Sequence, residues 1–160
     1  MPIKPGSPYF LQNTGNGPAF PEYWATLGII PPIHPPPPVP VRGGTKDMRI
    51  PVIFKPAINA PPVPNLYEIE ILSANVGNDK ATPQEPVRLQ PHGAVPQVWE
   101  LHSVPKEEDI YEIHLPDSLD SWTLPPYGNP EDLPPVGLHT ALPGPHPGEG
   151  GHQWKLIPAD

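Results

Sequence analysis

Residues 85–115, EPVRLQPHGAVPQVWELHSVPKEEDIYEIHL, contain three short runs in which apolar and polar residues alternate. The runs are Val87/Leu89, Trp99/Leu101 and Tyr111/Ile113/Leu115, separated by Pro, Gly and charged residues. An apolar spacing of two is typical of strands that bury one face. This stretch therefore predicts β-structure.

The same kind of set occurs on both sides of this stretch. Toward the N-terminus it consists of Tyr9-x-Leu11, Pro40-Val41 and Val52-x-Phe54, and toward the C-terminus of Tyr111-x-Ile113, Pro135-Val136-x-Leu138 and Trp154-x-Leu156. Recurrence at such a period indicates supersecondary units, none of which can bury its apolar face alone. We predict one domain over 1–160 with three repeats, at about 8–58, 66–105 and 110–158.

The predicted fold class is all-β. No segment has a convincing helical period, and 32 prolines leave room for no more than an isolated helical turn. Three four-stranded repeats can close into a barrel with a hairpin cap, the β-trefoil, and closure removes exposed strand edges. The residues expected to face inward are Leu11, Val41, Val52, Phe54, Ile69, Leu89, Trp99, Leu101, Ile113, Leu138, Trp154 and Leu156.

The composition raises the question of disorder, because Pro and Gly number 32 and 14 of 160 residues. Against disorder, four Trp, five Tyr and three Phe are spread along the chain and only 16% of residues are charged. We expect a folded chain rich in loops. Residues 28–40, GIIPPIHPPPPVP, should form an exposed polyproline II segment, since each Pro removes a donor from a sheet ladder.

The charge and the missing cysteines exclude several classes of partner and site. The net charge is −8 with no basic stripe, which argues against nucleic acid, and no apolar run approaches a membrane span of roughly 18 residues. No cysteine is present, so disulfides, thiolate metal sites and cysteine nucleophiles are absent. Without a hydrophobic leader, a cytoplasmic protein is expected, with leaderless secretion as the alternative.

Three features resemble a known family. They are the opening KPGSPYFLQN (residues 4–13), the Trp-x-Leu strand ends, and Y-E-I followed by S-W-T-L-P in the last unit. In these the chain resembles the fungal β-trefoil protease inhibitors, namely the mycocypins and related mushroom serine-protease inhibitors. The resemblance implies a monomer that blocks a papain-like, legumain-like or trypsin-like protease with surface loops, without chemistry of its own.

The resemblance nominates Asn75 and Asn78 as protease-binding residues. They are expected on a turn-rich loop, Asn75 to Asp79, beside a short strand, and mycocypins present an Asn to asparaginyl endopeptidase on the corresponding loop. Turn chemistry explains the same residues. Lys80 is the candidate for a trypsin-like pocket, although a surface lysine is commonly just solvated.

A second candidate loop follows the first predicted strand. Asn13, Gly15, Asn16 and Gly17 lie in a Gly-rich segment that could enter the narrow cleft of a papain-like protease, because small residues allow close backbone approach. A simple hairpin turn accounts for this composition as well.

Two other binding functions stand as alternatives. Gln97-Val98-Trp99 fits the Gln-x-Trp motif of ricin-B-type lectins, so a glycan could bind in a shallow pocket beside Trp99 or Trp154. Pro37-x-x-Pro40-x-Arg42 fits an adaptor motif for an SH3-like domain. A motif of this kind also arises by chance in a chain so rich in proline.

Neither a metal site nor a catalytic site is predicted. The seven histidines, at positions 34, 92, 102, 114, 139, 146 and 152, show no His-x-x-x-His spacing, so no metal or cofactor is expected. There is no Gly-x-Ser-x-Gly, no P-loop and no cysteine. The chain is not expected to be an enzyme.

Overall fold

The computed structural model describes residues 3–13, 23–27, 39–56, 65–78, 86–91, 93–103, 109–116, 118, 120–124, 130–140 and 152–159. Within these residues the strands are β1 (Pro8–Asn13), β2 (Tyr23–Thr26), β3 (Arg42–Gly44), β4 (Val52–Pro56), β5 (Leu66–Ile71), β6 (Ala74–Asn78), β7 (Val87–Leu89), β8 (Val98–Ser103), β9 (Ile110–His114), β10 (Asp120–Thr123), β11 (Gly137–Thr140) and β12 (Trp154–Pro158). Two single 3-10 turns, η1 (Lys46–Met48) and η2 (Pro130–Asp132), complete the regular structure.

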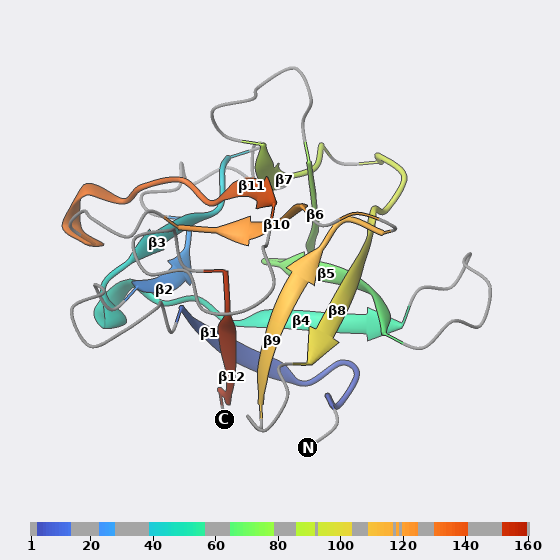
Figure 1. Ribbon diagram of the computed structural model, residues 1–160, viewed down its shortest axis with the longest axis horizontal. Helices are drawn as coiled ribbons and strands as arrows, with labels where there is room; N and C mark the ends of the chain where they lie inside the picture. Colours follow the sequence, from blue (N-terminus) through green and yellow to red (C-terminus); the bar gives the residue numbers. More distant parts are fainter. Residues whose placement is uncertain are drawn as a thin grey trace.

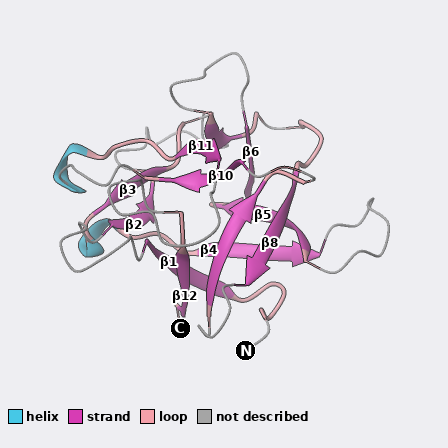
Figure 2. Cartoon of the chain, in the orientation of Figure 1, coloured by secondary structure: helices cyan, strands magenta, loops and turns pink. Residues whose placement is uncertain are grey.

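The prediction of an all-β chain is confirmed for this described part, in which strands dominate (Figure 2). Pro residues keep the strands to between three and six residues, because each one removes a backbone donor. None of the described segments forms a helix of the length and apolar character that a membrane span requires.

Six of the strands form a closed ring of hydrogen-bonded neighbours (Figure 1). The pairs run β1–β4, β4–β5, β5–β8, β8–β9, β9–β12 and β12–β1, and all of them are antiparallel. The ring is closed where the first and last strands meet, with Leu11 opposite Leu156. Because every ring strand is paired on both sides, no ring edge is left open to another chain.

The other six strands form three hairpins attached to the ring. β2–β3 pairs with β1, β6–β7 pairs with β5, and β10–β11 pairs with β9. Each successive group of four strands therefore contributes its first and last strand to the ring and its middle two to a hairpin.

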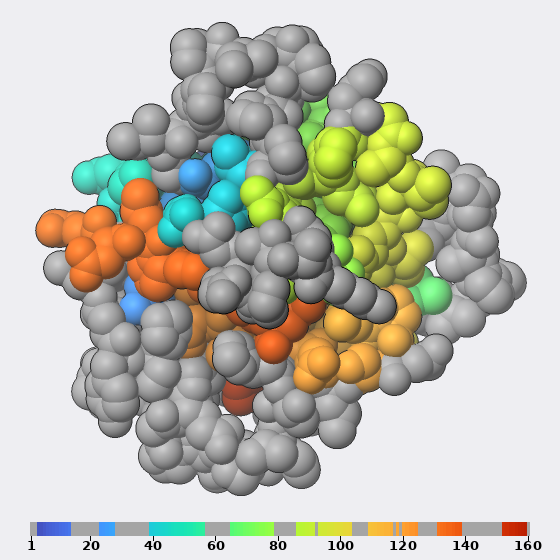
Figure 3. Space-filling view, turned by 90° about the horizontal axis from the view of Figure 1, so that it is seen from above, coloured from blue at the N-terminus to red at the C-terminus, as the bar shows by residue number. Residues whose placement is uncertain are grey.

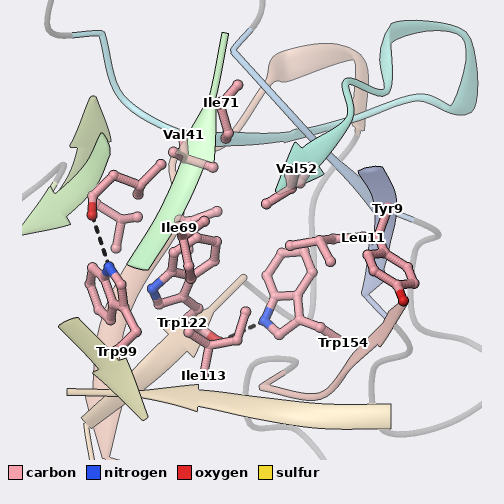
Figure 4. Close-up of a cluster of buried hydrophobic side chains, with 14 of the residues drawn as sticks. Tyr9, Leu11, Val41, Val52, Ile69, Ile71, Trp99, Ile113, Trp122 and Trp154 are labelled. Atoms are coloured by element: carbon pink, nitrogen blue, oxygen red, sulfur yellow. Dashed lines mark hydrogen bonds between the residues drawn. The ribbon is translucent and has the colours of Figure 1, made fainter. Parts of the chain in front are cut away.

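The interior is filled by three tryptophans that meet edge to face (Figure 4). Ring centroids lie 5.4 Å apart for Trp99 and Trp122, and 6.1 Å apart for Trp122 and Trp154. The indole N–H of Trp99 donates to the Val76 carbonyl at 2.9 Å, and that of Trp154 to the Trp122 carbonyl at 3.1 Å. Buried indoles whose N–H finds a partner combine large apolar burial with a fixed orientation.

Most of the predicted inward-facing residues are buried. The exception is Leu138, which is only partly buried and packs against the outside of the core. The core also includes residues outside the predicted inward-facing set, among them Tyr23, Ile71, Val76, Val87, Trp122, Leu124 and Val136. Four of these, Tyr23, Val76, Val87 and Trp122, lie on strands of the three hairpins.

The turn between β5 and β6 differs from the prediction. A turn-rich loop was expected from Asn75, but residues 75–78 belong to strand β6, so that prediction is wrong. The chain reverses earlier, at Leu72 and Ser73, whose φ values of 53° and 66° are both left-handed. Pairing of Val76 with Leu89 buries Val76 and outweighs the local turn preference of the flanking Asn and Gly residues.

Candidate functional site

The two asparagines nominated for protease binding lie in strand β6. The Asn75 side-chain oxygen is buried and has no hydrogen-bond partner within the described part of the chain. The Asn78 backbone N–H donates to Oε1 of Gln97 at 2.9 Å. Asn75 is therefore turned into the fold, and Asn78 helps to hold the segment before β8.

The first-repeat candidates are placed only in part. Asn13 is the last residue of β1, is 2% exposed, and pairs with Trp154 on one side and Tyr23 on the other. Its side chain is thus not displayed to a partner. Gly15, Asn16, Gly17 and Lys80 lie outside the described residues, and their protease-binding role stays a prediction.

The proposed SH3-type motif ends inside the sheet. Val41 N–H donates to the Val87 carbonyl at 2.8 Å, and Leu89 N–H donates to the Val39 carbonyl at 2.9 Å. Nη1 of Arg42 donates to the Leu133 carbonyl at 2.9 Å. Pro40, which forms a β-bridge with Arg88, and Arg42 are therefore engaged within the fold, while Pro37 lies outside the described residues.

The tryptophans of the lectin hypothesis belong to the core. Trp99 and Trp154 are both 0% exposed and both donate their indole N–H to backbone carbonyls. Neither ring has a free face on which a sugar could stack, which argues against the predicted shallow pockets. The Gln97 side chain, the other part of the motif, is used by the Asn78 N–H.

Two large apolar residues are exposed in the described structure. Leu72 is 46% exposed at the β5–β6 turn, and Val95 is 82% exposed between β7 and β8. The region from β7 to β8, yellow-green in Figure 3, forms part of the molecular surface seen in that view. Exposed apolar side chains on short, ordered connections are candidates for contact with another protein.

Val95 lies in a segment that we call the Val95 loop, residues 93–97. Residues 93–96 are all exposed. A side chain at Gly93, where φ is 86°, would meet no atom within 4 Å, so the chain stands clear of its neighbours there. Ala94 N–H donates to the Pro91 carbonyl at 3.1 Å, which fixes a turn at the start of the loop.

The far end of the Val95 loop is tied to the ring. Gln97 accepts the Asn78 N–H, Val98 pairs with Glu68 of β5, and Trp99 is fully buried. The loop thus projects a single large apolar side chain from a base that is held by hydrogen bonds and core packing. Such an arrangement limits the conformational entropy lost on binding.

A group of histidines and glutamates lies on strands β8 and β9 and just before β12. Nε2 of His114 contacts Oε1 of Glu112 at 2.8 Å, and Nε2 of His152 lies 3.6 Å from Oε2 of the same carboxylate. The His102 ring packs against the His114 ring with centroids 4.2 Å apart, and His102 also pairs with Glu100 at 2.5 Å. His114 and His152 are buried.

This group is not arranged as a metal site. Across the described residues no set of three or more His, Asp or Glu side chains could hold a metal ion. His34, His92 and His146 lie outside that part of the chain, and the side chain of His139 does as well. Instead, two imidazoles of the group, those of His114 and His152, contact one carboxylate, that of Glu112.

The pKa of Glu112 is lower than the ordinary value of 4.5. Burial alone would raise it, but the hydrogen bond from His114 and the positive charges of His152, His114 and His102 together outweigh burial. A depressed carboxylate pKa stabilises the fold above the unfolded-state value. That stabilisation is lost as the pH falls below 4.5 and through the folded-state pKa.

We therefore expect Glu112→Gln to flatten the acid side of the stability profile. The free energy of unfolding of the wild-type chain should fall between about pH 5 and about pH 3, and that of Glu112→Gln should fall less over this interval. Urea unfolding at several pH values measures both. Asp47→Asn, which alters a carboxylate on the exposed turn η1, is the control, and an equally steep decline in Glu112→Gln would contradict the assignment.

The sequence contains a local indication that residues 93–97 form a loop, although the alternation of apolar and polar residues does not reveal it. Val95 stands between Gly93 and Pro96, both of which interrupt strands, and it has no apolar neighbour at a spacing of two. Leu72 carried no such signal, since Leu is unusual at a left-handed turn position. Its exposure becomes apparent only from the pairing of β5 with β6.

The fold is similar to that of a solved structure, although the sequence itself matches no known family. No protein-family model matches the sequence, and no curated protein is significantly similar to it. The fold is similar to that of a proteinase inhibitor from Coprinopsis cinerea, with a TM-score of 0.68 and 14% sequence identity over 99% of this chain and 100% of the other. The chain thus shares, over its whole length, the fold of a fungal proteinase inhibitor, as the sequence resemblance predicted.

Proposed function

We propose that this chain is a β-trefoil protein that inhibits a protease through loops projecting from the closed ring. The observation that carries the proposal is the full-length likeness to a proteinase inhibitor, with neither chain leaving a substantial part unmatched. Folds alone do not determine activity, so the loops must supply the specificity. The exposed, well-anchored Val95 loop is the described segment best suited to this.

Equivalent contacts in successive groups of strands support the trefoil and the single domain with three repeats. Trp99 of β8 bonds to the third residue of β6, and Trp154 of β12 bonds to the third residue of β10. Leu101 N–H donates to the Asn65 carbonyl at 2.9 Å, and Leu156 N–H to the Asp109 carbonyl at 2.8 Å. Asn65 and Asp109 share the left-handed conformation just before β5 and β9.

The tyrosines that begin the three predicted repeats also come near one another. Tyr9 and Tyr67 both make edge contacts with Phe54, each with ring centroids 6.2 Å apart. The pKa of Tyr111 is raised, first by burial and then by Asp109, Tyr67 and Tyr9. A pseudo-threefold axis through the ring accounts for this convergence.

Inhibition in this proposal requires no chemistry by the chain. A loop that is already fixed by its ring loses little entropy on docking, so an interface of ordinary size can be tight. The protease is blocked because its cleft is filled. Asn78, Lys80, Gly15, Asn16 and Gly17 remain proposed contacts alongside the Val95 loop.

The test is an inhibition panel against papain, legumain, trypsin and elastase with the purified full-length chain. We expect reversible inhibition of at least one enzyme with an inhibition constant in the nanomolar range, while heat-denatured chain has no effect. Inhibition of legumain would point to Asn78 as a contact, inhibition of trypsin to Lys80, and inhibition of papain to Gly15, Asn16 and Gly17. If all four enzymes retain full activity at micromolar chain, the proposed function is wrong.

A further inference from the structure

The exposure of Val95 is unusual for its residue type. At 82% exposed it is far more accessible than Leu72, the other large apolar residue that is exposed in the described structure. Removing an exposed valine side chain from water is favourable, because the hydrophobic effect is proportional to the apolar area buried. A partner that buries Val95 would gain a hydrophobic contribution to its binding free energy that folding alone does not provide.

The backbone at Val95 has the shape that a protease cleft accepts. A residue before proline is restricted to extended conformations, and Pro96 therefore keeps Val95 extended. The Pro96 ring also fixes its own φ, so both residues have less conformational freedom to lose on binding. Leu72 differs, because its φ of 53° places it in a tight reversal that cannot lie along an extended cleft.

The chemistry of the loop selects the pocket. Residues 93–97, Gly-Ala-Val-Pro-Gln, carry no charge. Serine proteases of the chymotrypsin fold differ in their primary pocket, which is acidic in trypsin, a deep apolar slot in chymotrypsin and small in elastase. The valine side chain, which is β-branched and has three carbons, suits the small pocket of elastase. It would leave the apolar slot of chymotrypsin partly empty, and it offers no cation to the acidic pocket of trypsin.

We propose that Val95 is the specificity-determining residue of the inhibitory surface, and that it enters the primary pocket of an elastase-type serine protease. This inference rests on the proposed inhibitory function and names its target class. The Val95 loop is the contact segment, with Pro96 beyond Val95 and Gln97 bound to Asn78 as the anchor.

The experiment measures inhibition constants of four chains against elastase, chymotrypsin and trypsin. The chains are the wild type, Val95→Asp, Val95→Lys and Leu72→Asp. Because both positions are exposed, each variant should retain the wild-type circular dichroism spectrum and unfolding midpoint, which are recorded first. Leu72→Asp is the matched control, an acidic residue on the other exposed apolar position.

We expect the wild type to inhibit elastase most strongly and Val95→Asp to weaken that inhibition by about 100-fold or more, as for a central interface residue. Val95→Lys should no longer inhibit elastase and should inhibit trypsin instead, because a lysine matches the acidic primary pocket of trypsin. Leu72→Asp should leave all three constants within about threefold of the wild type.

Two results would overturn the inference, and they differ in what else they affect. If the wild type inhibits a protease but the Val95 variants inhibit it equally well, Val95 is not the specificity residue and the inhibitory function stands. If the wild type inhibits none of elastase, chymotrypsin and trypsin, the inference fails, and if it also inhibits neither papain nor legumain, the proposed function fails with it.

Discussion

Replacing Trp154 with alanine should remove a large part of the stability of the fold. Trp154 is 0% exposed, lies on the last strand, and is paired with Asn13 of β1 and Tyr111 of β9. It therefore packs where the ring closes. Truncating a buried tryptophan costs about 3–5 kcal/mol, against a total stability of about 5–15 kcal/mol for a domain.

The expected loss combines two effects that a second variant separates. Trp154→Ala leaves a cavity beside Trp122 and also leaves the Trp122 carbonyl without its indole donor. Trp154→Phe keeps most of the ring volume but not the N–H, so it should cost less, about 1–3 kcal/mol.

Urea unfolding followed by circular dichroism measures both variants. Lys155→Ala, on the same strand and exposed, is the control and should change stability by no more than about 0.5 kcal/mol. If Trp154→Ala were no more destabilised than this control, the closure of the ring through β12 would be contradicted.

A second large effect is expected at Gly43, for the opposite reason. A Cβ atom at this position would lie 2.7 Å from Cδ1 of Leu124 and 2.9 Å from Cδ1 of Tyr23. Carbon atoms at their optimal separation are about 3.5–4.0 Å apart, so even alanine must displace these buried side chains. We expect Gly43→Ala to cost about 1–3 kcal/mol and Gly43→Val to cost more.

A second substitution that removes the crowded side chain tests whether steric crowding causes the loss of stability in Gly43→Ala. In the double variant Gly43→Ala with Leu124→Ala, the added methyl occupies space that the leucine has left, so the combined loss should be smaller than the sum of the two single losses. Gly93→Ala is the control for backbone strain alone, since its Cβ would meet nothing within 4 Å. Strict additivity of the Gly43 and Leu124 losses would contradict the close packing of β3 on the core.

The sequence predicted the ring better than it predicted the hairpins. Tyr9-x-Leu11 and Trp99-x-Leu101 alternate cleanly because one face of each ring strand meets the core and the other does not. The hairpin strand β6 was missed because Asn75, Gly77 and Asn78 favour turns. Its pairing with β7 and the Trp99 indole bond to the Val76 carbonyl are contacts with distant residues, which local preference cannot reveal.

The candidate site was less predictable for a related reason. Residue type alone does not distinguish the exposed Val95 from the buried Val87, which becomes buried through the pairing of β7 with β6. Conversely, Asn13 and Arg42 look like surface groups in the sequence, yet one is buried between two strands and the other is bonded to Leu133. Which side chains are exposed depends on which strands pair, and only exposed side chains can contact another protein.

The most direct test of the central claim is amide hydrogen exchange of the chain alone and in complex with the protease that it inhibits most strongly. If loops on a rigid closed ring block the enzyme, binding should slow exchange in connections such as residues 91–97. Exchange in β1, β4, β5, β8, β9 and β12 should be slow in both states and unchanged. Protection confined to the ring strands, or ring strands that exchange rapidly in the free chain, would contradict the account.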